Sequence, residues 1–201
     1  MRLIRVPCLV SLAVLAGAGG LGAQEPFIET PYYPVNVGTR WEYRLKGQNT
    51  PIIMRVAKHE PIDGKLCALV ETVVDNNVVA SEHIRPEKDG VYRYTSLGQK
   101  AEPPLMFLKL PPAESQTWKV ETQIMGQAAK GTFTMEKEQI EVPYSKNKLT
   151  AFVCKSADME AAGQKISTIT WFVEGVGMAR QHANIAGTEV VLELQKFEQP
   201  Q

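Results

Sequence analysis

Apolar and polar residues alternate along much of the chain from Thr39 to Phe197. The alternation is sharpest near the C-terminus, where Val190, Leu192 and Leu194 are separated by polar residues. Side chains two positions apart in a strand share one face, so each such segment has one face for a core. Helical periodicity is scarce. The pattern therefore predicts an all-β protein with at most one short helix.

Short turn sequences divide the first apolar runs from one another. Asp63-Gly64, Asn76-Asn77 and Asp89-Gly90 separate consecutive runs, and pairs of this kind accept the positive φ angles that tight hairpins require. Consecutive strands are therefore predicted to be neighbours in an antiparallel meander. About eleven strands in one chain favour a strongly curved sheet or a partly closed barrel.

The alternation breaks between residues 96 and 116. Pro103-Pro104 and Pro111-Pro112 enclose an apolar run there, and proline has no N–H to give to a ladder. We predict a proline-rich connector at 96–116, which either packs its apolar residues into the core or covers a cavity as a lid. It joins two halves, about 39–95 and 117–197, that begin with similar tryptophan-containing segments. Duplication and shared strand composition both account for this weak similarity.

The first 23 residues have the order of a secretory signal. Arg2 and Arg5 precede an apolar run at 8–18, and a stretch of mostly small residues follows at 19–23. The apolar run is shorter than the roughly 20 residues that a membrane-spanning helix needs. The sequence therefore predicts export to the periplasm or the extracellular space. Residues 24–201 would form a single β-rich domain with no transmembrane span after cleavage.

Composition excludes some partners and leaves the state of the cysteines open. The 22 basic and 22 acidic side chains balance, so nothing indicates a nucleic-acid partner. Cys67 and Cys154 both lie inside apolar runs of the exported part. An exported chain with an even cysteine count usually pairs them, but two separate buried thiols fit the sequence equally well.

No pattern of reactive residues specifies a chemistry. His59, His83 and His182 lack the short ligand spacing of a metal site, so no metal and no cofactor is predicted. The chain also lacks the G-x-S-x-G turn that positions a hydrolase serine. We assign no catalytic residue and predict a protein that is not an enzyme, with a hydrolase as a third option after the two functions given below.

Four stretches carry a resemblance to a known group of proteins. The exported domain opens with YYPVNVGTRWEY at 32–43, and DGVYRY, LKLPP and WFVEGVGMAR follow at 89–94, 108–112 and 171–180. In these stretches the chain resembles a broad group of exported bacterial β-rich proteins of unknown function. That group is similar in outline to the half-barrels of periplasmic lipoprotein carriers. The resemblance implies an antiparallel sheet rolled around an apolar interior, and it transfers no catalytic residue.

Two functions fit a protein of this kind. The first is a non-catalytic carrier that binds a hydrophobic small molecule or lipid, with aromatic and methionine side chains lining the groove. The second is a structural or interaction module that meets another protein of the cell envelope through strand edges or loops. The implied apolar interior favours the carrier. The candidate lining residues, which would also serve as ordinary core, are Trp41, Tyr43, Trp118, Trp171 and Met106.

Overall fold

The computed structural model describes residues 27–124, 126–161 and 163–200, so the predicted signal at 1–23 lies outside the described residues. All regular elements in this part of the chain are β-strands. They are β1 (Arg40–Leu45), β2 (Pro51–Ile62), β3 (Lys65–Val74), β4 (Asn77–Pro86), β5 (Gly90–Ser96), β6 (Gln99–Lys109), β7 (Thr117–Ile124), β8 (Gln127–Ile140), β9 (Leu149–Ala161), β10 (Gln164–Val173), β11 (Gly177–Ile185) and β12 (Thr188–Glu198).

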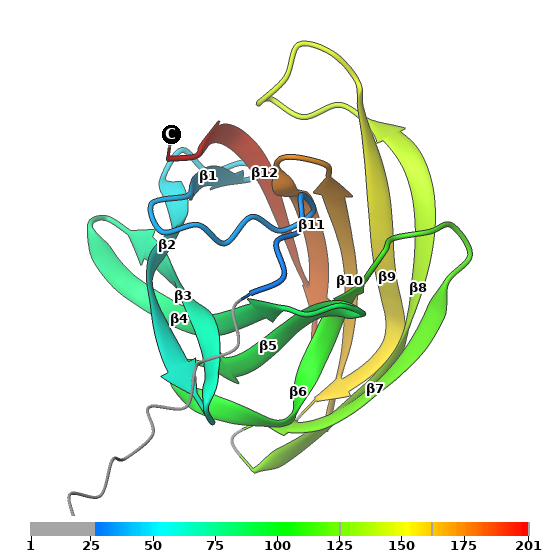
Figure 1. Cartoon of the computed structure of the whole chain (residues 1–201). Coiled ribbons are helices and arrows are strands. Elements are labelled where there is room, and N and C mark those ends of the chain that lie inside the picture. Colours follow the sequence, from blue (N-terminus) through cyan, green and yellow to red (C-terminus); the bar gives the residue numbers. More distant parts are fainter. Residues whose placement is uncertain (1–26, 125, 162, 201) are drawn as a thin grey trace, which may run out of the picture.

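The strands form one closed antiparallel barrel, shown in Figure 1. Each strand pairs with its neighbours in chain order, and β12 returns to pair with β1, for example through Trp41 and Phe197. The prediction of an all-β antiparallel meander is confirmed, and the sheet closes fully where the sequence indicated partial closure. Closure gives each strand a partner on both sides, which removes the exposed edges of an open sheet.

The prediction of a connector at 96–116 is wrong for most of that segment. Strand β6 runs through Pro103 and Pro104 and pairs with β5. The register passes from Arg93 opposite Leu105 to Thr95 opposite Lys100, so residues 101–104 of β6 bulge where β5 supplies one residue. A bulge interrupts the ladder locally and therefore accommodates residues that cannot donate an N–H.

Side chains complete the junction between β6 and β7. The backbone ladder joins Ala101 to Ile124 and Glu102 to Gln123 and does not continue beyond them. Farther along, Thr122 Oγ1 donates to the carbonyl oxygen of Pro103 at 2.5 Å, and Trp118 Nε1 donates to that of Met106 at 3.2 Å. We call this stretch the β6–β7 seam. In this seam, hydrogen bonds from side chains join the two strands where backbone hydrogen bonds between them are missing.

Residues 27–39 cross one end of the barrel ahead of β1 (Figure 1), and we call them the plug segment. Its Pro31 carbonyl accepts a hydrogen bond from the N–H of Gly175 at 2.9 Å, and its Val35 carbonyl lies 2.7 Å from His59 Nε2. Tyr33 of the plug packs edge-on against Phe107, with ring centroids 5.4 Å apart. The plug therefore contacts β2, β6 and the turn between β10 and β11.

Two stretches singled out in the sequence meet inside the barrel. Trp41 Nε1 donates to the Val176 carbonyl at 2.7 Å, and the Tyr43 hydroxyl donates to the Met178 carbonyl at 2.8 Å. Between these carbonyls Gly177 has a φ of +90°, and a Cβ there would lie 3.2 Å from Cδ of Pro34. Glycine is needed at this point both for the backbone conformation and for the close approach of the plug.

Cys67 and Cys154, the cysteines within the described residues, are free and buried. Cys67 lies on β3 and Cys154 on β9, and these strands are not neighbours in the barrel. The structure therefore has two separate thiols and not the disulfide that the sequence left open. Burial raises the pKa of Cys67 to about 11 and that of Cys154 to about 12, so both are thiols at neutral pH.

Candidate binding cavity

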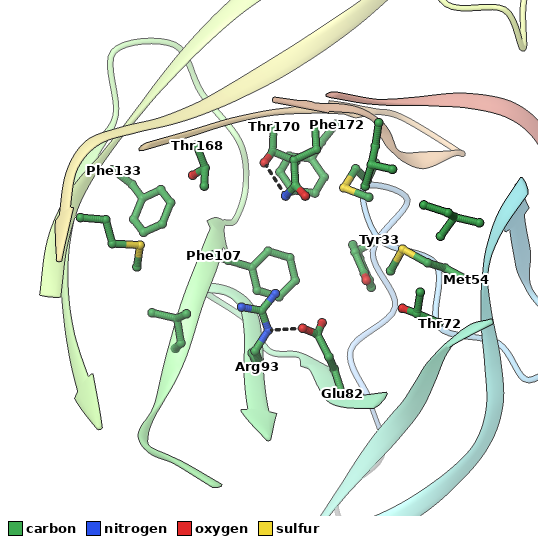
Figure 2. Close-up of a pocket in the computed structure, with 16 residues that line it drawn as sticks. Tyr33, Met54, Thr72, Glu82, Arg93, Phe107, Phe133, Thr168, Thr170 and Phe172 are labelled. Atoms are coloured by element: carbon green, nitrogen blue, oxygen red, sulfur yellow. Dashed lines mark hydrogen bonds and ion pairs between the residues drawn. The ribbon is translucent and has the colours of Figure 1, made fainter. Parts of the chain in front are cut away.

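A cavity of about 270 Å³ lies inside the barrel (Figure 2). Tyr33 of the plug lies on its wall, and the other lining residues come from ten strands. The apolar lining consists of Ile52, Met54, Leu105, Phe107, Phe133, Met159, Phe172, Met178 and Leu192. The polar lining consists of Tyr33, Thr72, Glu82, Arg93, Thr168, Thr170 and Gln181. The wall is thus predominantly apolar with a few polar groups, as in most small-molecule sites.

Strand alternation explains which residues reach the cavity. On β10, Thr168, Thr170 and Phe172 line it, whereas the residues between them point the other way. On β6, Leu105 and Phe107 line it in the same manner. The cavity is therefore the unfilled centre of the barrel and not a gap between loops.

An ion pair lies within this apolar wall. Arg93 Nε of β5 is 3.1 Å from Glu82 Oε1 of β4, and the two side chains are 28% and 24% exposed. The Arg93 guanidinium also lies over the Phe107 ring, 5.6 Å from its centroid, in a cation–π contact. On the opposite wall Gln181 donates to the hydroxyl of Thr170 at 3.3 Å. These contacts place charge and hydrogen-bonding capacity at the centre of the barrel.

Tyr33 adds a hydroxyl to the same region. Its side chain is 6% exposed, and burial, followed by the negative charge of Glu82, raises its pKa while Arg93 opposes that rise. Among the residues that the structure describes, its hydroxyl has no hydrogen-bond partner. The hydroxyl is therefore neutral and keeps its donor and acceptor capacity for a molecule in the cavity.

None of the five predicted lining residues is on the wall of this cavity. Trp41 and Tyr43 are 2% and 1% exposed and are bound to the backbone of the segment around Gly177. Trp118 belongs to the β6–β7 seam and stacks on Phe133, with ring centroids 5.4 Å apart. It therefore supports a lining residue from behind.

Trp171 and Met106 alternate with lining residues on their own strands. The indole N–H of Trp171 donates to the carboxylate of the exposed Glu138. Met106 packs on Gly90, where a Cβ would lie 2.8 Å from the methionine Cγ. Both side chains thus belong to the opposite face of the strand from their cavity-lining neighbours.

Sequence reasoning missed Tyr33, Glu82 and Arg93. A usable signal was present: Arg93 is two positions from the buried Val91, and Glu82 is two positions from the buried Ile84. A charged residue in phase with the buried face of a strand is unusual because an isolated charge is costly to bury. Such residues are candidates for a pair or a binding site.

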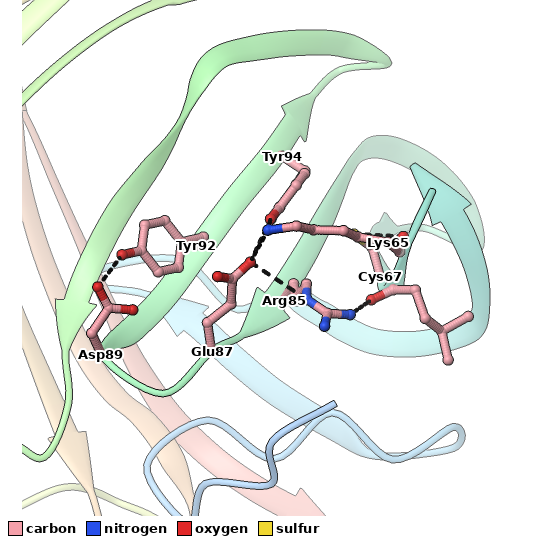
Figure 3. A network of polar contacts seen from close by, with 8 residues as sticks. Lys65, Cys67, Arg85, Glu87, Asp89, Tyr92 and Tyr94 are labelled. Atoms are coloured by element: carbon pink, nitrogen blue, oxygen red, sulfur yellow. Dashed lines mark hydrogen bonds and ion pairs between the residues drawn. The ribbon is translucent and has the colours of Figure 1, made fainter. Parts of the chain in front are cut away.

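A second polar network lies outside the cavity (Figure 3). Lys65 Nζ is 2.9 Å from Glu87 Oε1, and the Tyr94 hydroxyl donates to the same oxygen at 2.5 Å. Burial would raise the pKa of Glu87, but the hydrogen bonds from Tyr94 and Lys65 bring it below its usual value. Arg85 Nη1 donates to the Leu66 carbonyl at 2.6 Å. These hydrogen bonds and ion pairs connect β3, β4 and β5 at one end of the barrel.

Thr95, His83 and Glu60 form a hydrogen-bonded chain in the order expected of a nucleophile, a base and an acid. The ring nitrogens of His83 lie 2.7 Å from the Thr95 hydroxyl and 2.7 Å from Glu60. Thr95 is 4% exposed, however, and its hydroxyl accepts the backbone N–H of His83 at 3.1 Å. The hydroxyl is held by the protein and shielded from a substrate, so this chain serves the packing of β2, β4 and β5.

The rest of the described residues adds no metal cluster and no helical membrane span. They contain no group of three or more histidine, cysteine or acidic side chains that is arranged to hold a metal ion. In the same residues no helix is long and apolar enough to cross a membrane.

Comparisons with known proteins find similar solved structures but no family. No family model matches the chain, and no curated protein matches it. One similar structure is a protein from Bacteroides fragilis NCTC 9343, assigned as exported and as having a YmcC-like fold. Its TM-score is 0.43 at 9% identity, over 85% of this chain and 100% of that one. Another is a protein from Parabacteroides distasonis ATCC 8503, assigned as a lipoprotein. Its TM-score is 0.47 at 11% identity, over 84% of this chain and 99% of that one.

Proposed function

We propose that this protein is an exported, non-catalytic carrier that holds one apolar small molecule inside its barrel. The observation that carries the proposal is the apolar cavity of about 270 Å³ with the plug segment at its wall. Ligand cavities usually measure about 300–1,000 Å³, so this one suits a small ligand. If each carbon takes roughly the 30 Å³ of a water molecule, the cavity holds on the order of ten carbons.

Burial of such a molecule is energetically sufficient for useful binding. At about 0.8 kcal/mol per methylene, ten methylenes contribute roughly 8 kcal/mol, which is the free energy of about micromolar affinity. The costs of association reduce that value, so micromolar binding is the upper end of the expected range. Reversible binding of this strength is what a carrier needs in order to release its cargo.

Export rests on the amino-terminal sequence. Arg2 and Arg5, the apolar run at 8–18 and the mostly small residues at 19–23 support a signal that directs the chain to the periplasm or the extracellular space. A carrier of an apolar molecule is useful in either compartment because such a molecule is poorly soluble in water. Detection of the chain without residues 1–23 in a periplasmic or culture fraction would test this part of the proposal.

The binding test uses two substitutions on the same strand. Thr168→Phe directs a ring into the cavity, whereas Ile169→Phe places the same ring on the other face of β10. The neutral apolar probe 1-aminonaphthalene, which is small enough for this cavity, should bind the unaltered protein and the Ile169 variant alike, and the Thr168 variant at least 10-fold more weakly. Thermal unfolding shows that each variant is folded. Absence of probe binding to the unaltered protein, or equal affinity of both variants, would refute the proposal.

A module that meets another envelope protein is the second candidate, and exposed apolar residues favour it. Val78, Val79 and Leu97 are 51%, 54% and 57% exposed at the ends of adjacent hairpins. The N–H of Leu97 donates to the Ser81 carbonyl at 2.8 Å, which keeps these hairpins together. Val79→Ser should leave probe binding unchanged under the carrier hypothesis. Loss of one stoichiometric envelope partner in this variant would support the module instead.

A further inference from the structure

Three polar groups from separate elements converge on the cavity (Figure 2). Tyr33 comes from the plug segment, Glu82 from β4 and Arg93 from β5, and all three line the same space. Most of the remaining wall is apolar, including the Phe107 ring beneath the guanidinium. A molecule that fills the cavity therefore meets these three groups together.

Two of these groups, Tyr33 and Arg93, keep hydrogen-bonding capacity that the protein does not use. The Tyr33 hydroxyl has no partner among the described residues, although its side chain is 6% exposed. Arg93 Nε is 3.1 Å from Glu82, yet its N–H is not directed at an acceptor. A buried polar group without a partner costs about 1–3 kcal/mol. The cost is recovered if a ligand supplies the missing hydrogen bonds.

The charge of the site selects among polar head groups. Arg93 and Glu82 neutralise each other, so the site has no surplus positive charge for an anion. A carboxylate head would place a second negative charge beside Glu82 in a largely apolar cavity, where repulsion is weakly screened. An uncharged head that both donates and accepts hydrogen bonds faces no such repulsion. It can use the Tyr33 hydroxyl, the guanidinium and the Glu82 carboxylate at once.

We infer that the ligand is an amphiphile with an apolar chain of about ten carbons and an uncharged, hydroxyl-bearing head held by Tyr33, Glu82 and Arg93. Glu82 excludes the corresponding carboxylates. This inference rests on the proposed carrier function and adds the chemical class of the cargo. The apolar chain occupies the wall formed by the phenylalanine, methionine, leucine and isoleucine side chains.

The experiment compares 1-decanol with decanoate, which share a ten-carbon chain and differ in the head. Each is titrated against the full exported protein at pH 7.5 by displacement of 1-aminonaphthalene. The unaltered protein should bind decanol at least 10-fold more tightly than decanoate. Glu82→Gln removes the carboxylate that pairs with the Arg93 guanidinium. The affinity of this variant for decanoate should therefore rise about 10-fold, and its preference for decanol over decanoate should vanish.

A matched control is available on the other face of the barrel. Glu71→Gln removes a carboxylate that pairs with Arg55 at 2.8 Å between neighbouring strands, but it does not line the cavity. The preference of the Glu71→Gln variant for decanol over decanoate should equal that of the unaltered protein. Tyr33→Phe should weaken decanol binding about 3- to 10-fold relative to the unaltered protein. The ratio of the affinities for decanol and decanoate, measured in the unaltered protein, tests the inference even if a variant does not fold.

The outcomes separate this inference from the function on which it rests. Probe binding with equal or tighter binding of decanoate in the unaltered protein would overturn the head-group assignment and leave the carrier function standing. An unchanged preference in folded Glu82→Gln would likewise overturn the role of Glu82. Failure of the probe and of both ten-carbon compounds to bind would overturn the carrier function itself.

Discussion

Thr122 provides a sharp test of how the barrel is closed at the β6–β7 seam. Its side chain is 2% exposed, and its hydroxyl donates to the Pro103 carbonyl at 2.5 Å where the backbone ladder is absent. Thr122→Val keeps the shape of the side chain but removes the donor. Pro103 itself is exposed, so water can replace the lost donor, and the expected loss is that of one ordinary hydrogen bond, about 0.5–1.5 kcal/mol.

Thermal unfolding measures this loss directly. For a chain of this length, 1 kcal/mol corresponds to about 2–4 °C, so a loss of about 1 kcal/mol should lower the Tm by about 2–4 °C. Hydrogen exchange should also accelerate in β6 and β7 before it does so in the other strands, because the seam opens locally. Thr117→Val, at an exposed position of the same strand, should shift the Tm by less than about 1 °C. Equal shifts for the two variants would show that the side chain does not close the seam.

Three further predictions concern the indole of Trp41, the second polar network around Glu87 and the thiols of Cys67 and Cys154. Trp41→Phe should lower the Tm by several degrees because it removes a buried donor, whereas Trp171→Phe, whose indole bonds an exposed carboxylate, should change it little. Glu87 has a lowered pKa when folded, so its contribution to stability is present above the ordinary carboxyl value of 4.5 and is lost as the pH falls through the folded pKa. The Tm difference between the unaltered protein and Glu87→Gln should therefore narrow on acidification, and a constant difference from pH 7 to 3 would contradict this. Maleimide labelling with peptide mapping at pH 7 should find Cys67 and Cys154 unmodified in the folded protein and modified in urea, and rapid labelling of either in the folded state would contradict their burial.

Local features of the sequence were sufficient to predict most of the strands and their antiparallel order. Alternation of apolar and polar residues indicates a strand with one buried face, and pairs such as Asp63-Gly64 indicate tight hairpins. Both signals can be read from the sequence because they depend on residues close together in the chain. Pro103 and Pro104 misled the same reasoning. Whether a proline ends a strand or occupies a bulge within it depends on the neighbouring strand. The sequence around the proline does not show which residues of that strand lie opposite it.

Closure of the barrel required a contact that no local pattern encodes. Trp41 pairs with Phe197 across nearly the whole described chain. The apolar residues of β6 occur on both of its faces, so the sequence did not reveal that Leu105 and Phe107 face the cavity and Met106 does not. The choice of face depends on how each strand is placed in the closed sheet.

Tertiary structure alone assembled the candidate site and separated the two cysteines. Tyr33, Glu82 and Arg93 are far apart along the chain and come from three elements that meet because the sheet rolls around one interior. Periodicity shows that a strand has an inner face, since that property belongs to the strand. It does not show which inner faces meet or whether space remains between them, because those properties belong to the packing of all strands together.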